Sequence, residues 1–481
     1  MKYYSTNGKA DRATLHEAVV RGLASDKGLF MPEVIRHLPE SFFDEIQDLS
    51  FQEVAYRVAD AFFGEDVPAD TLKQIVYDTL SFDCPVVKVT ENIYSLELFH
   101  GPTLAFKDVG ARFMARLLGY FIKQEGCKQV NVLVATSGDT GKAAMEGFAD
   151  VPQTKILVFY PKDGVSKVQE TQMVTQDGAN VGVCAVEGNF DDAQAGVKRI
   201  FSDEAIRATL ADRGYFLSSA NSINWGRILP QVVYYISAYC DLVRDGKLSM
   251  GDKVNFCVPT GNFGDILAAY YAKRMGLPVG KLICASNCND VLTDFLRTGV
   301  YDKNRPFHTT MSPSMDILVS SNLERLLFDL SGENDAEVKG YMDALAKTGK
   351  YEVSDAIKAA LADQFWGGFC GEAGTSAAIA KYYKENGYLI DTHTAVAFRV
   401  AETRRTDAPM VVLSTASPFK FPRDVLTALG VEAPASDFAA MAALTAGTGA
   451  EAPASLRELD KLEVRFKTVL QPADIRTAAL R

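Results

Sequence analysis

The sequence predicts an α/β protein with two parallel-sheet domains and an additional N-terminal helical subdomain. Three observations support this class. Apolar runs of strand length alternate with helical patterns from about Pro85 onward, an order typical of parallel sheets covered by helices on both faces. Glycine-rich loops follow several of these runs, at the edge where such sheets bind ligands. Before Pro85 the apolar spacing is mainly helical.

Length and composition are those of an ordinary globular protein. The chain has 481 residues, of which 47% are hydrophobic and 23% charged, enough for two or three domains. The net charge of −11 argues against a nucleic-acid-binding surface. No apolar run reaches the roughly 18 residues of a membrane span, and no apolar signal-peptide core follows Met1. We therefore expect a cytoplasmic protein.

Cysteines and histidines are too few and too scattered to indicate a metal site. The eight cysteines form no Cys-x-x-Cys pair, and the chain has five histidines. Structural zinc sites need clustered ligands of these types. We expect no metal, and we expect reduced, mostly buried thiols.

The first 83 residues show helical spacing at 13–23, 51–63 and 69–80. They carry no evident chemistry, and we expect them to form the helical subdomain, 1–83. From residue 84 onward, strands are predicted at 93–98, 130–135, 156–160, 181–186, 254–258, 282–285 and 410–414. Helices are predicted at 109–122, 142–149, 166–175, 191–201, 227–243 and 266–275. We expect one α/β domain at 84–245 and a second at 246–481, whose C-terminal part is mostly helical.

Lys107 is the first candidate for chemistry. It falls where the predicted strand 93–98 gives way to the helix 109–122, so its side chain can stand over a cleft. A lysine there is a nucleophilic amine if its neighbours lower its pKa. Because most lysines are solvated surface residues, the support has to come from later loops.

The loop 259–265 reads Pro-Thr-Gly-Asn-Phe-Gly-Asp and joins a predicted strand to a predicted helix. Its glycines let backbone amides turn toward one point, and the helix N-terminus adds unpaired N–H groups. Such a loop binds phosphate, although a tight turn with Asp265 as helix cap explains the loop alone equally well. The similar loop 188–192 contains two acids that would repel a phosphate, so helix capping is the better interpretation there. Ser166 begins a capping box and is expected to be structural.

Two more loops follow predicted strands. The loop 136–141, Thr-Ser-Gly-Asp-Thr-Gly, offers hydroxyls and amides to a carboxylate, with a plain turn as the alternative. In the loop 414–420, Thr415 could present a neutral hydroxyl to the same cleft. Arg227 opens a helix after Asn221-Ser222-Ile223-Asn224 and could bind an anion, or be a solvated arginine at a helix start.

A lysine, a phosphate loop, a carboxylate loop and a terminal hydroxyl are together the elements of a pyridoxal 5'-phosphate (PLP) enzyme. In such enzymes the lysine forms a Schiff base with the cofactor, and the cofactor ring is an electron sink. We therefore expect PLP at Lys107.

Five segments also resemble the motifs of one family. They are 22–32 (GLASDKGLFMP), 99–108 (FHGPTLAFKD), 135–141 (ATSGDTG), 221–224 (NSIN) and 261–265 (GNFGD). With these motifs the chain resembles, over nearly its whole length, the threonine synthase family. This family is part of the tryptophan-synthase-β-like group (fold type II) of PLP enzymes. The long N-terminal extension resembles the branch of enteric bacteria and fungi.

One position departs from that branch. The branch usually reads Thr-Ala-His-Pro-Ala-Lys-Phe near the last strand, whereas residues 415–421 read Thr-Ala-Ser-Pro-Phe-Lys-Phe. Ser417 thus stands where histidine is expected. The roles of Thr415 and Lys420 carry over, and any role of that histidine does not.

The resemblance implies conversion of O-phospho-L-homoserine and water to L-threonine and phosphate, the last step of threonine biosynthesis. It implies Lys107 as the Schiff-base lysine and catalytic base. The implied cofactor contacts are Gly261, Asn262, Phe263, Gly264 and Asp265 around the phosphate, and Thr415 at the pyridine nitrogen. The implied substrate contacts are Ser137, Gly138, Asp139 and Thr140 for the carboxylate, Asn221, and the cations Arg112, Lys162, Arg227 and Lys420 for the phosphate. The expected partner is this small molecule, without nucleic acid or membrane, and the chain is expected to be a monomer or a weak homodimer.

Other functions stay open at this point. A serine or threonine dehydratase, or a cysteine-synthase-like enzyme, would use the same fold, but two anionic pockets favour the phosphorylated substrate. A PLP-binding homologue without activity is a second class, against which the intact Lys107 argues. A purely structural protein would leave four coincident loop motifs unexplained.

Overall fold

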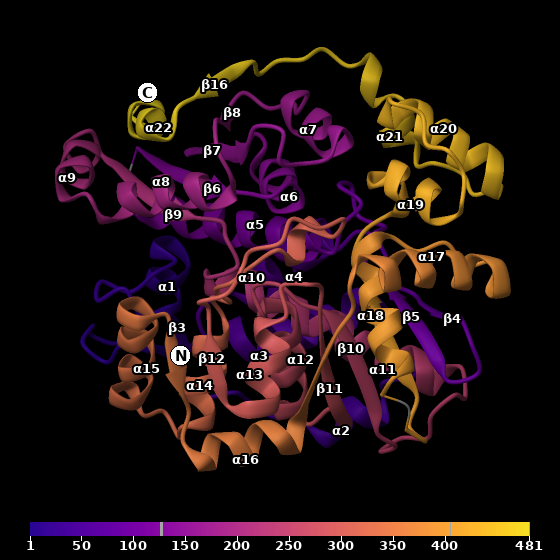
Figure 1. The fold of residues 1–481 in the computed structure, drawn as a ribbon. Coiled ribbons are helices and arrows are strands. Elements are labelled where there is room, and N and C mark those ends of the chain that lie inside the picture. Colours follow the sequence, from indigo (N-terminus) through magenta and orange to yellow (C-terminus); the bar gives the residue numbers. More distant parts are fainter. Residues whose placement is uncertain (126–127, 405, 481) are drawn as a thin grey trace.

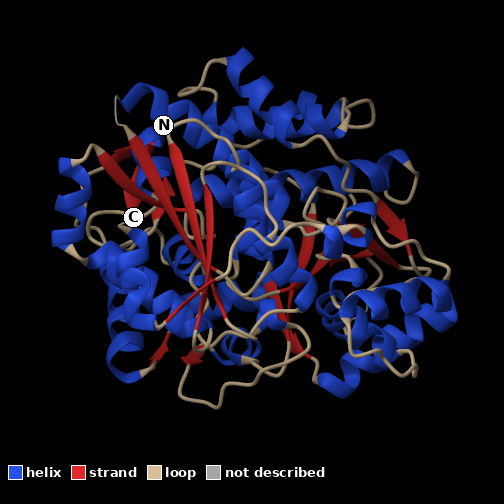
Figure 2. Ribbon diagram, turned by 90° about the horizontal axis from the view of Figure 1, so that it is seen from above, coloured by secondary structure: helices blue, strands red, loops and turns tan. Residues whose placement is uncertain are grey.

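Two sheets of mostly parallel strands form the framework of the molecule (Figure 1). The computed structural model describes residues 1–125, 128–404 and 406–480. Figure 2 shows the strands of both sheets with helices around them, which confirms the predicted α/β class. Within the described residues, no helix is long and apolar enough to cross a membrane. No group of three or more His, Cys, Asp or Glu side chains in these ranges is arranged to hold a metal ion.

The first sheet is parallel throughout, in the order β16-β8-β7-β6-β9 as far as the structure describes it. Its inner strands are valine-rich and almost fully buried, because helices cover both faces of a parallel sheet. The strands are β6 (Gln129–Ala135), β7 (Thr154–Pro161), β8 (Val181–Val186), β9 (Tyr215–Ser219) and β16 (Thr468–Leu470). Its helices are α6 (Asp139–Phe148), α7 (Lys167–Val174), α8 (Phe190–Ser202), α9 (Glu204–Asp212) and α22 (Ile475–Ala479).

The second sheet has the order β14-β11-β10-β15-β5-β4 in the described ranges. It is parallel except at one edge, where β4 runs antiparallel to β5. The strands are β4 (Val86–Lys88), β5 (Ile93–Glu97), β10 (Val254–Pro259), β11 (Val279–Ser286), β14 (Phe365–Phe369) and β15 (Met410–Ser414). Its helices are α11 (Val232–Arg244), α12 (Gly264–Arg274), α13 (Val291–Thr298), α16 (Asp355–Gln364), α17 (Glu372–Asn386) and α18 (Thr392–Glu402).

Helix α5 (Lys107–Glu125) joins the two sheets. It follows β5 of the second sheet and packs against α6 of the first. It also packs against the short helices α10 (Trp225–Ile228) and η1 (Leu229–Gln231). The sequence therefore places its first residue, Lys107, between the two α/β units.

The N-terminal segment contains the predicted helices and, in addition, a small sheet that the sequence reading missed. The predicted helices are α1 (Leu15–Arg21), α3 (Phe51–Phe63) and α4 (Ala69–Thr79), and the short helix α2 (Glu40–Asp44) was not predicted. The antiparallel strands β1 (Lys2–Ser5), β2 (Ala13–Thr14) and β3 (Phe30–Pro32) pair in the order β2-β1-β3. Strands of two to four residues are too short to give a recognisable alternation of apolar and polar residues.

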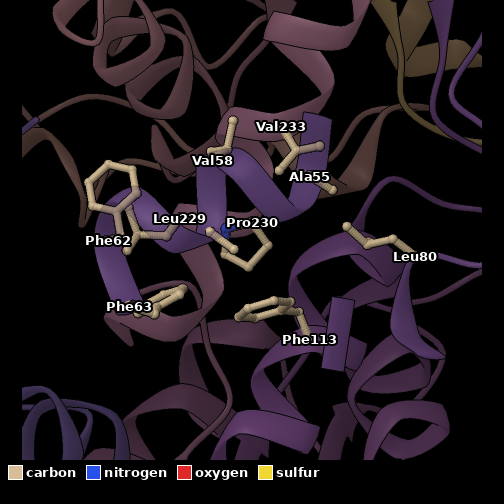
Figure 3. Close-up of a pocket in the computed structure, with 10 residues that line it drawn as sticks. Ala55, Val58, Phe62, Phe63, Leu80, Phe113, Leu229, Pro230 and Val233 are labelled. Atoms are coloured by element: carbon tan, nitrogen blue, oxygen red, sulfur yellow. The ribbon is translucent and has the colours of Figure 1, made fainter. Parts of the chain in front are cut away.

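An apolar cavity lies where α3 meets α5 and η1 (Figure 3). Phe63 and Phe113 stack beside it with ring centroids 5.6 Å apart. Its volume is about 10 Å³, at most enough for one water molecule, and its walls are almost wholly apolar. It is therefore a packing defect between the N-terminal helices and α5, with no capacity for a ligand.

The remaining elements lie around the second sheet and in the C-terminal segment. They are β12 (Val300–Asp302), β13 (Lys350–Glu352), α14 (Leu323–Leu330), α15 (Asp335–Thr348), α19 (Pro422–Ala428), α20 (Asp437–Thr448), α21 (Ala454–Arg457) and the 3₁₀ turns η2 (Pro313–Met315), η3 (Pro418–Lys420), η4 (Leu459–Lys461) and η5 (Pro472–Asp474). Six of the seven described cysteines are buried, as expected, and Cys127 lies outside the described residues.

The chain passes between the two sheets more than once. Strand β5 pairs with β15 in the second sheet, although it precedes the strands of the first. After β15, the C-terminal segment crosses the molecule, and β16 pairs with β8 in the first sheet (the yellow segment in Figure 1). The limits 1–83, 84–245 and 246–481 therefore stay a proposal about segments of sequence, because both sheets draw strands from across them.

Candidate active site

Lys107 is held at the carboxyl edge of the second sheet by the loop after β15. The N–H of Phe106 donates to the carbonyl of Thr415 at 2.9 Å, and the N–H of Ser417 donates to the carbonyl of Leu104 at 3.1 Å. Leu104 takes the left-handed conformation, with φ of 61°, so the chain turns sharply before α5. These bonds fix the lysine turn against Thr415.

The surroundings of Lys107 make its amine reactive. The residue is partly buried, and removal from water lowers its pKa to about 8. The carboxylates of Asp139 and Asp265 oppose this shift, whereas the charges of Arg227 and Lys420 add to it. An amine with such a pKa is neutral in half of the molecules at pH 8, and in that form it can act as nucleophile or base. Lys107 is thus not an ordinary solvated lysine.

The loop between β10 and α12 has the form of an anion site. Phe263 is the N-cap of α12 in a left-handed conformation, with φ of 65°, and among the described residues its side chain makes no capping bond. Apart from the Ile266 N–H, which Asp265 binds, the N–H groups at the helix start are therefore available to a ligand. A Cβ at Gly261 would lie 2.6 Å from the carbonyl oxygen of Ser314. Only glycine fits at that approach, and Ser320 Oγ fixes the loop by donating to the Gly261 carbonyl at 2.8 Å.

Asp265 lies at the start of the same helix. Its Oδ1 accepts the N–H of Ile266 at 2.7 Å. Burial raises its pKa to about 6, although this hydrogen bond and the charge of Lys107 favour the carboxylate. Asp265 is therefore close enough to Lys107 for each to affect the charge of the other.

The loop between β6 and α6 satisfies most of its own polar groups. Thr136 Oγ1 accepts the N–H of Gly138 at 3.0 Å and that of Gly141 at 2.8 Å. Ser137 and Thr140 remain partly exposed. Their hydroxyls are the groups of this loop best placed to receive a carboxylate.

Asp139 and Lys420 are paired with each other. Lys420 Nζ lies 2.6 Å from Asp139 Oδ1, and both side chains are buried. Gln169 Nε2 also donates to this oxygen at 2.8 Å. Burial opposes ionisation, but the Lys420 charge and these hydrogen bonds hold the pKa of Asp139 below its ordinary value. Sequence reasoning offered both residues to the substrate separately, whereas the structure joins them in an ion pair across the two sheets.

Thr415 and Arg227 lie near Lys107, whereas the contacts of Asn221 are with the first sheet. Thr415 is buried, and its carbonyl is bound to the lysine turn. Arg227 is buried, which lowers its pKa to about 10, and within the described ranges its Nε has no hydrogen-bond partner. A buried arginine with an unused donor suits an incoming anion. Asn221 is tied to the end of β6, because its Nδ2 donates to the Ala135 carbonyl at 3.1 Å.

Two predicted cations have their side chains elsewhere. The Arg112 guanidinium donates to Ser81 Oγ and to the Asp78 carbonyl, both at 3.3 Å, next to α4. Lys162 is exposed and pairs with Glu187 at 2.7 Å. It lines a groove of about 410 Å³ between β7, α7 and the C-terminal segment. Neither contact brings these side chains to Lys107.

Sequence reasoning missed the turn before α18 and the segment around Ser314. His393 is buried between Asp391 and Ser314. The DTHT sequence at 391–394 has the form of a helix start, which signals a cap and nothing more. Ser417 also has a structural part, because its Oγ accepts the N–H of Phe419 at 3.4 Å at the start of η3.

Comparison with known proteins identifies the family of the chain. Residues 83–363 match the family model "Pyridoxal-phosphate dependent enzyme", so the chain is a PLP-dependent enzyme by class. Residues 2–80 match "Threonine synthase N terminus" and residues 394–478 match "Threonine synthase, C-terminal". The chain belongs to the threonine synthase family.

Relatives and solved structures support the same family. Threonine synthase of Pseudomonas aeruginosa is 42% identical over 90% of this chain and 92% of its own length. The crystal structure of PLP-bound threonine synthase from Brucella melitensis has a TM-score of 0.89 at 39% identity, covering 100% of this chain and 99% of that one. The yeast threonine synthase structure has a TM-score of 0.87 at 35% identity, covering 99% of this chain and 97% of that one. These likenesses confirm the predicted fold type II.

The residues present fit PLP. Lys107 provides an amine of lowered pKa. The start of α12 provides backbone N–H groups beside Gly261, where a side chain would collide with Ser314. Thr415 lies at the lysine turn and carries a neutral hydroxyl. An amine, an anion site and a neutral ring partner are the groups that PLP requires.

Proposed function

We propose that this protein converts O-phospho-L-homoserine and water to L-threonine and phosphate, the last step of threonine biosynthesis. The observation that carries the proposal is the position of Lys107. Its amine, of pKa about 8, lies between the charges of Asp139 and Asp265 and beside that of Arg227. Membership of the threonine synthase family supports this choice of reaction.

Seven residues would hold the cofactor or support its site. Lys107 would anchor it, and the N–H groups of Gly261, Asn262, Phe263 and Gly264 would bind its phosphate. Asp265 would hold the start of α12 and balance the charge of Lys107. Thr415 would donate or accept a hydrogen bond at the pyridine nitrogen without adding charge. When bound, PLP supplies an electron sink for negative charge on the substrate carbons.

Lys107 would also move protons. The Nζ of Lys107, when it is not bonded to the cofactor, would act as a base at the substrate α-carbon. Its lowered pKa makes the neutral, proton-accepting form available at about pH 8 and above. The same amine would return a proton at the end of the reaction.

Two ends of the substrate need anion sites. The hydroxyls of Ser137 and Thr140, with the backbone of Gly138, would bind the carboxylate. Arg227, with its unused Nε donor, would attract the phosphate, and Asn221 would line the same side. Asp139 and Lys420 would act as a fixed pair that holds this loop, since each already uses the other's charge. Arg112 and Lys162 would make no substrate contact, because their side chains bind elsewhere.

The test combines cofactor trapping with product analysis. Borohydride reduction should abolish the visible absorption of the bound cofactor and leave a stable, near-ultraviolet-absorbing secondary amine on Lys107, and the unreduced protein should release phosphate and threonine in equal amounts from O-phosphohomoserine. Lys107→Ala should lower the rate by roughly 10²–10⁴-fold or more, as removal of a general base does. Turnover of serine or threonine in place of the phosphorylated substrate would move the function to a dehydratase. A fixed cofactor with no turnover of any of these substrates would indicate a non-catalytic homologue.

The finer partner assignments belong to the same proposal. We propose that the protein works in the cytoplasm as a monomer or weak homodimer, without nucleic acid. The net charge of −11 supports the last point. Sedimentation at two protein concentrations would measure the oligomeric state, and its repetition with added RNA would show whether nucleic acid binds.

A further inference from the structure

Asp391 is a buried carboxylate whose two oxygens serve two different neighbours. It is the N-cap of α18 and is fully buried. Oδ2 accepts the N–H of His393 at 2.9 Å and lies 2.8 Å from His393 Nδ1. Oδ1 accepts the N–H of Thr394 at 3.1 Å and also the Thr394 hydroxyl. A helix cap alone needs only the two backbone bonds, so the imidazole and hydroxyl contacts call for another explanation.

The first arm runs from Asp391 to the phosphate loop. His393 Nε2 accepts the N–H of Ser314 at 3.2 Å. An imidazole nitrogen that accepts a hydrogen bond carries no proton, so the His393 proton is on Nδ1 and is donated to Asp391. The carbonyl of Ser314 is the group that a side chain at Gly261 would meet at 2.6 Å. His393 therefore holds the segment that lies directly on Gly261.

The second arm runs from Asp391 to the lysine turn. Thr394 Oγ1 gives its proton to Asp391 and accepts the N–H of Thr415 at 3.3 Å. The carbonyl of Thr415 accepts the N–H of Phe106 at 2.9 Å, and Phe106 directly precedes Lys107. The hydroxyl of Thr394 thus relays the position of Asp391 to Thr415 and to the reactive lysine.

We propose that Asp391 is a positioning residue that sets both ends of the cofactor site, the phosphate end through His393 and the ring-nitrogen end through Thr394. This inference rests on the proposed function, because it takes Gly261 and Thr415 as the cofactor contacts. It also assigns a use to an imidazole in a chain whose position 417 lacks the histidine of its branch. The imidazole of His393 acts through Ser314.

Asparagine at position 391 separates this role from plain helix capping. Asparagine caps helices about as well as aspartate, and its single oxygen could still serve Thr394. Its NH₂ group would then face both the Nδ1–H and the backbone N–H of His393, donor against donor. The imidazole would have to change its tautomer, and its Nε2–H would then oppose the N–H of Ser314. Asp391→Asn is therefore expected to break the first arm and keep the second.

The experiment compares wild type with Asp391→Asn, His393→Ala, Thr394→Val and the control Asp203→Asn. Asp203 is the N-cap of α9 and accepts the N–H of Ile206 at 3.0 Å, so its variant makes the same chemical change at a helix without site contacts. Each purified protein is stripped of PLP and retitrated, and its Kd for PLP and its visible spectrum are recorded. Thermal unfolding of the apo forms measures the effect on folding.

We expect variants in the His393 arm and in the Thr394 arm to change different measurements. Asp391→Asn and His393→Ala should raise the Kd for PLP roughly tenfold or more, the effect of losing one buried hydrogen bond to an anion site. Thr394→Val should shift the absorption maximum of the bound cofactor and change Kd less. Asp203→Asn should leave both readouts at wild-type values.

The outcomes also distinguish this inference from the function on which it rests. A wild type that binds no PLP would overturn the proposed function and this inference with it. A wild type that binds PLP, with the three variants equal to it in Kd and spectrum, would overturn this inference alone. Equal losses in all variants, matched by equal falls in apo unfolding temperature, would reduce Asp391 to a structural cap and would also overturn it.

Discussion

Two loops of the same kind, one in each sheet, differ in where their polar groups go. Both follow a buried parallel strand, contain two glycines and open a helix. In the loop 136–141, Thr136 accepts two of the N–H groups, and Asp139 is paired with Lys420. In the loop 261–265, the N-cap Phe263 makes no side-chain bond among the described residues, and Gly261 is pressed against Ser314.

This difference shows that a glycine-rich strand–helix junction does not by itself define a ligand site. The loop 136–141 uses its charge inside the protein and leaves hydroxyls to a ligand. The loop 261–265 leaves helix N–H groups to a ligand, which suits a phosphate. The negative charges of Asp139 in the first loop and Asp265 in the second both act on Lys107.

The largest effect should come from breaking the internal pair of the first loop. Asp139→Asn leaves the buried Lys420 charge without its partner, and loss of one member of such a pair costs about 3–5 kcal/mol. We expect that loss in the free energy of unfolding measured with urea. The double variant Asp139→Asn with Lys420→Met should regain most of it, because no unpaired charge remains. If Asp139→Asn keeps wild-type stability, the ion pair between Asp139 and Lys420 does not stabilise the loop 136–141.

The second-largest effect should come from a substitution in the loop 261–265. Gly261→Ala places a methyl group 2.6 Å from the Ser314 carbonyl, and such overpacking costs about 1–3 kcal/mol. We expect the affinity for PLP to fall by roughly ten- to a hundredfold, measured by titration of the apoenzyme. Gly340→Ala is the matched control, because its added methyl meets no described atom within 4 Å on an exposed helix. It should leave PLP binding unchanged and add up to about 1 kcal/mol of stability.

The third effect concerns the pH dependence of Lys107. Its folded pKa of about 8 lies below the ordinary value of 10.5, so the unfolded chain binds more protons between these values. Burying the charged Lys107 therefore lowers the stability of the apoenzyme by a constant amount below about pH 8. This cost disappears, and the free energy of unfolding rises, as the pH increases from about 8 to 10.5. The rate of PLP capture should rise roughly tenfold per pH unit below pH 8 and level off above it. Stopped-flow absorbance would measure this rate, and a profile centred near 10.5 would contradict the assignment.

The same profile can rank the two loops. Asp139 and Asp265 both raise the pKa of Lys107, with the larger effect from Asp139. Removing either carboxylate should move the midpoint further down, more so for Asp139→Asn than for Asp265→Asn. Equal shifts would mean that the lysine does not distinguish the loops.

The smallest effect should come from the strand–helix junction at residues 188–192, for which we expect helix capping and no ligand binding. Asn189 caps α8 in a capping box with Asp192, as the sequence predicted. Asn189→Ala should cost about 1 kcal/mol of unfolding free energy, typical of a lost N-cap. PLP binding and turnover should stay at wild-type values. Any loss of PLP would show that this third junction also serves the site.

The predicted strands are confirmed because each is an apolar run bounded by turn residues. The strand-to-helix position of Lys107 is confirmed for the same reason. The capping boxes at Ser166 and Asn189 are local patterns and are present. The pairing of Asp139 with Lys420 could not be predicted, since it depends on how loops of two different sheets meet.

Other differences follow from helix geometry and strand length. Arg112 is five residues after Lys107 on α5, roughly 140° around the helix, so its direction toward α4 was available from the spacing. The small N-terminal sheet and the short strands β4 and β16 gave no periodic signal, because three residues do not establish an alternation. Asp391 and His393 read as a helix start, and their second use appears only once Ser314 is seen beside them.

The crossing of the chain between its two sheets has a consequence for biosynthesis. Strand β5 stays unpaired on one side until β15 is made, and β8 has an open edge until β16 is made. While the ribosome is translating the residues between them, both half-built sheets expose strand edges that can pair with other nascent chains. The long sequence separation of these pairings also slows their formation. Chaperone protection during synthesis would therefore matter more for this topology than for one whose two domains are each completed in turn.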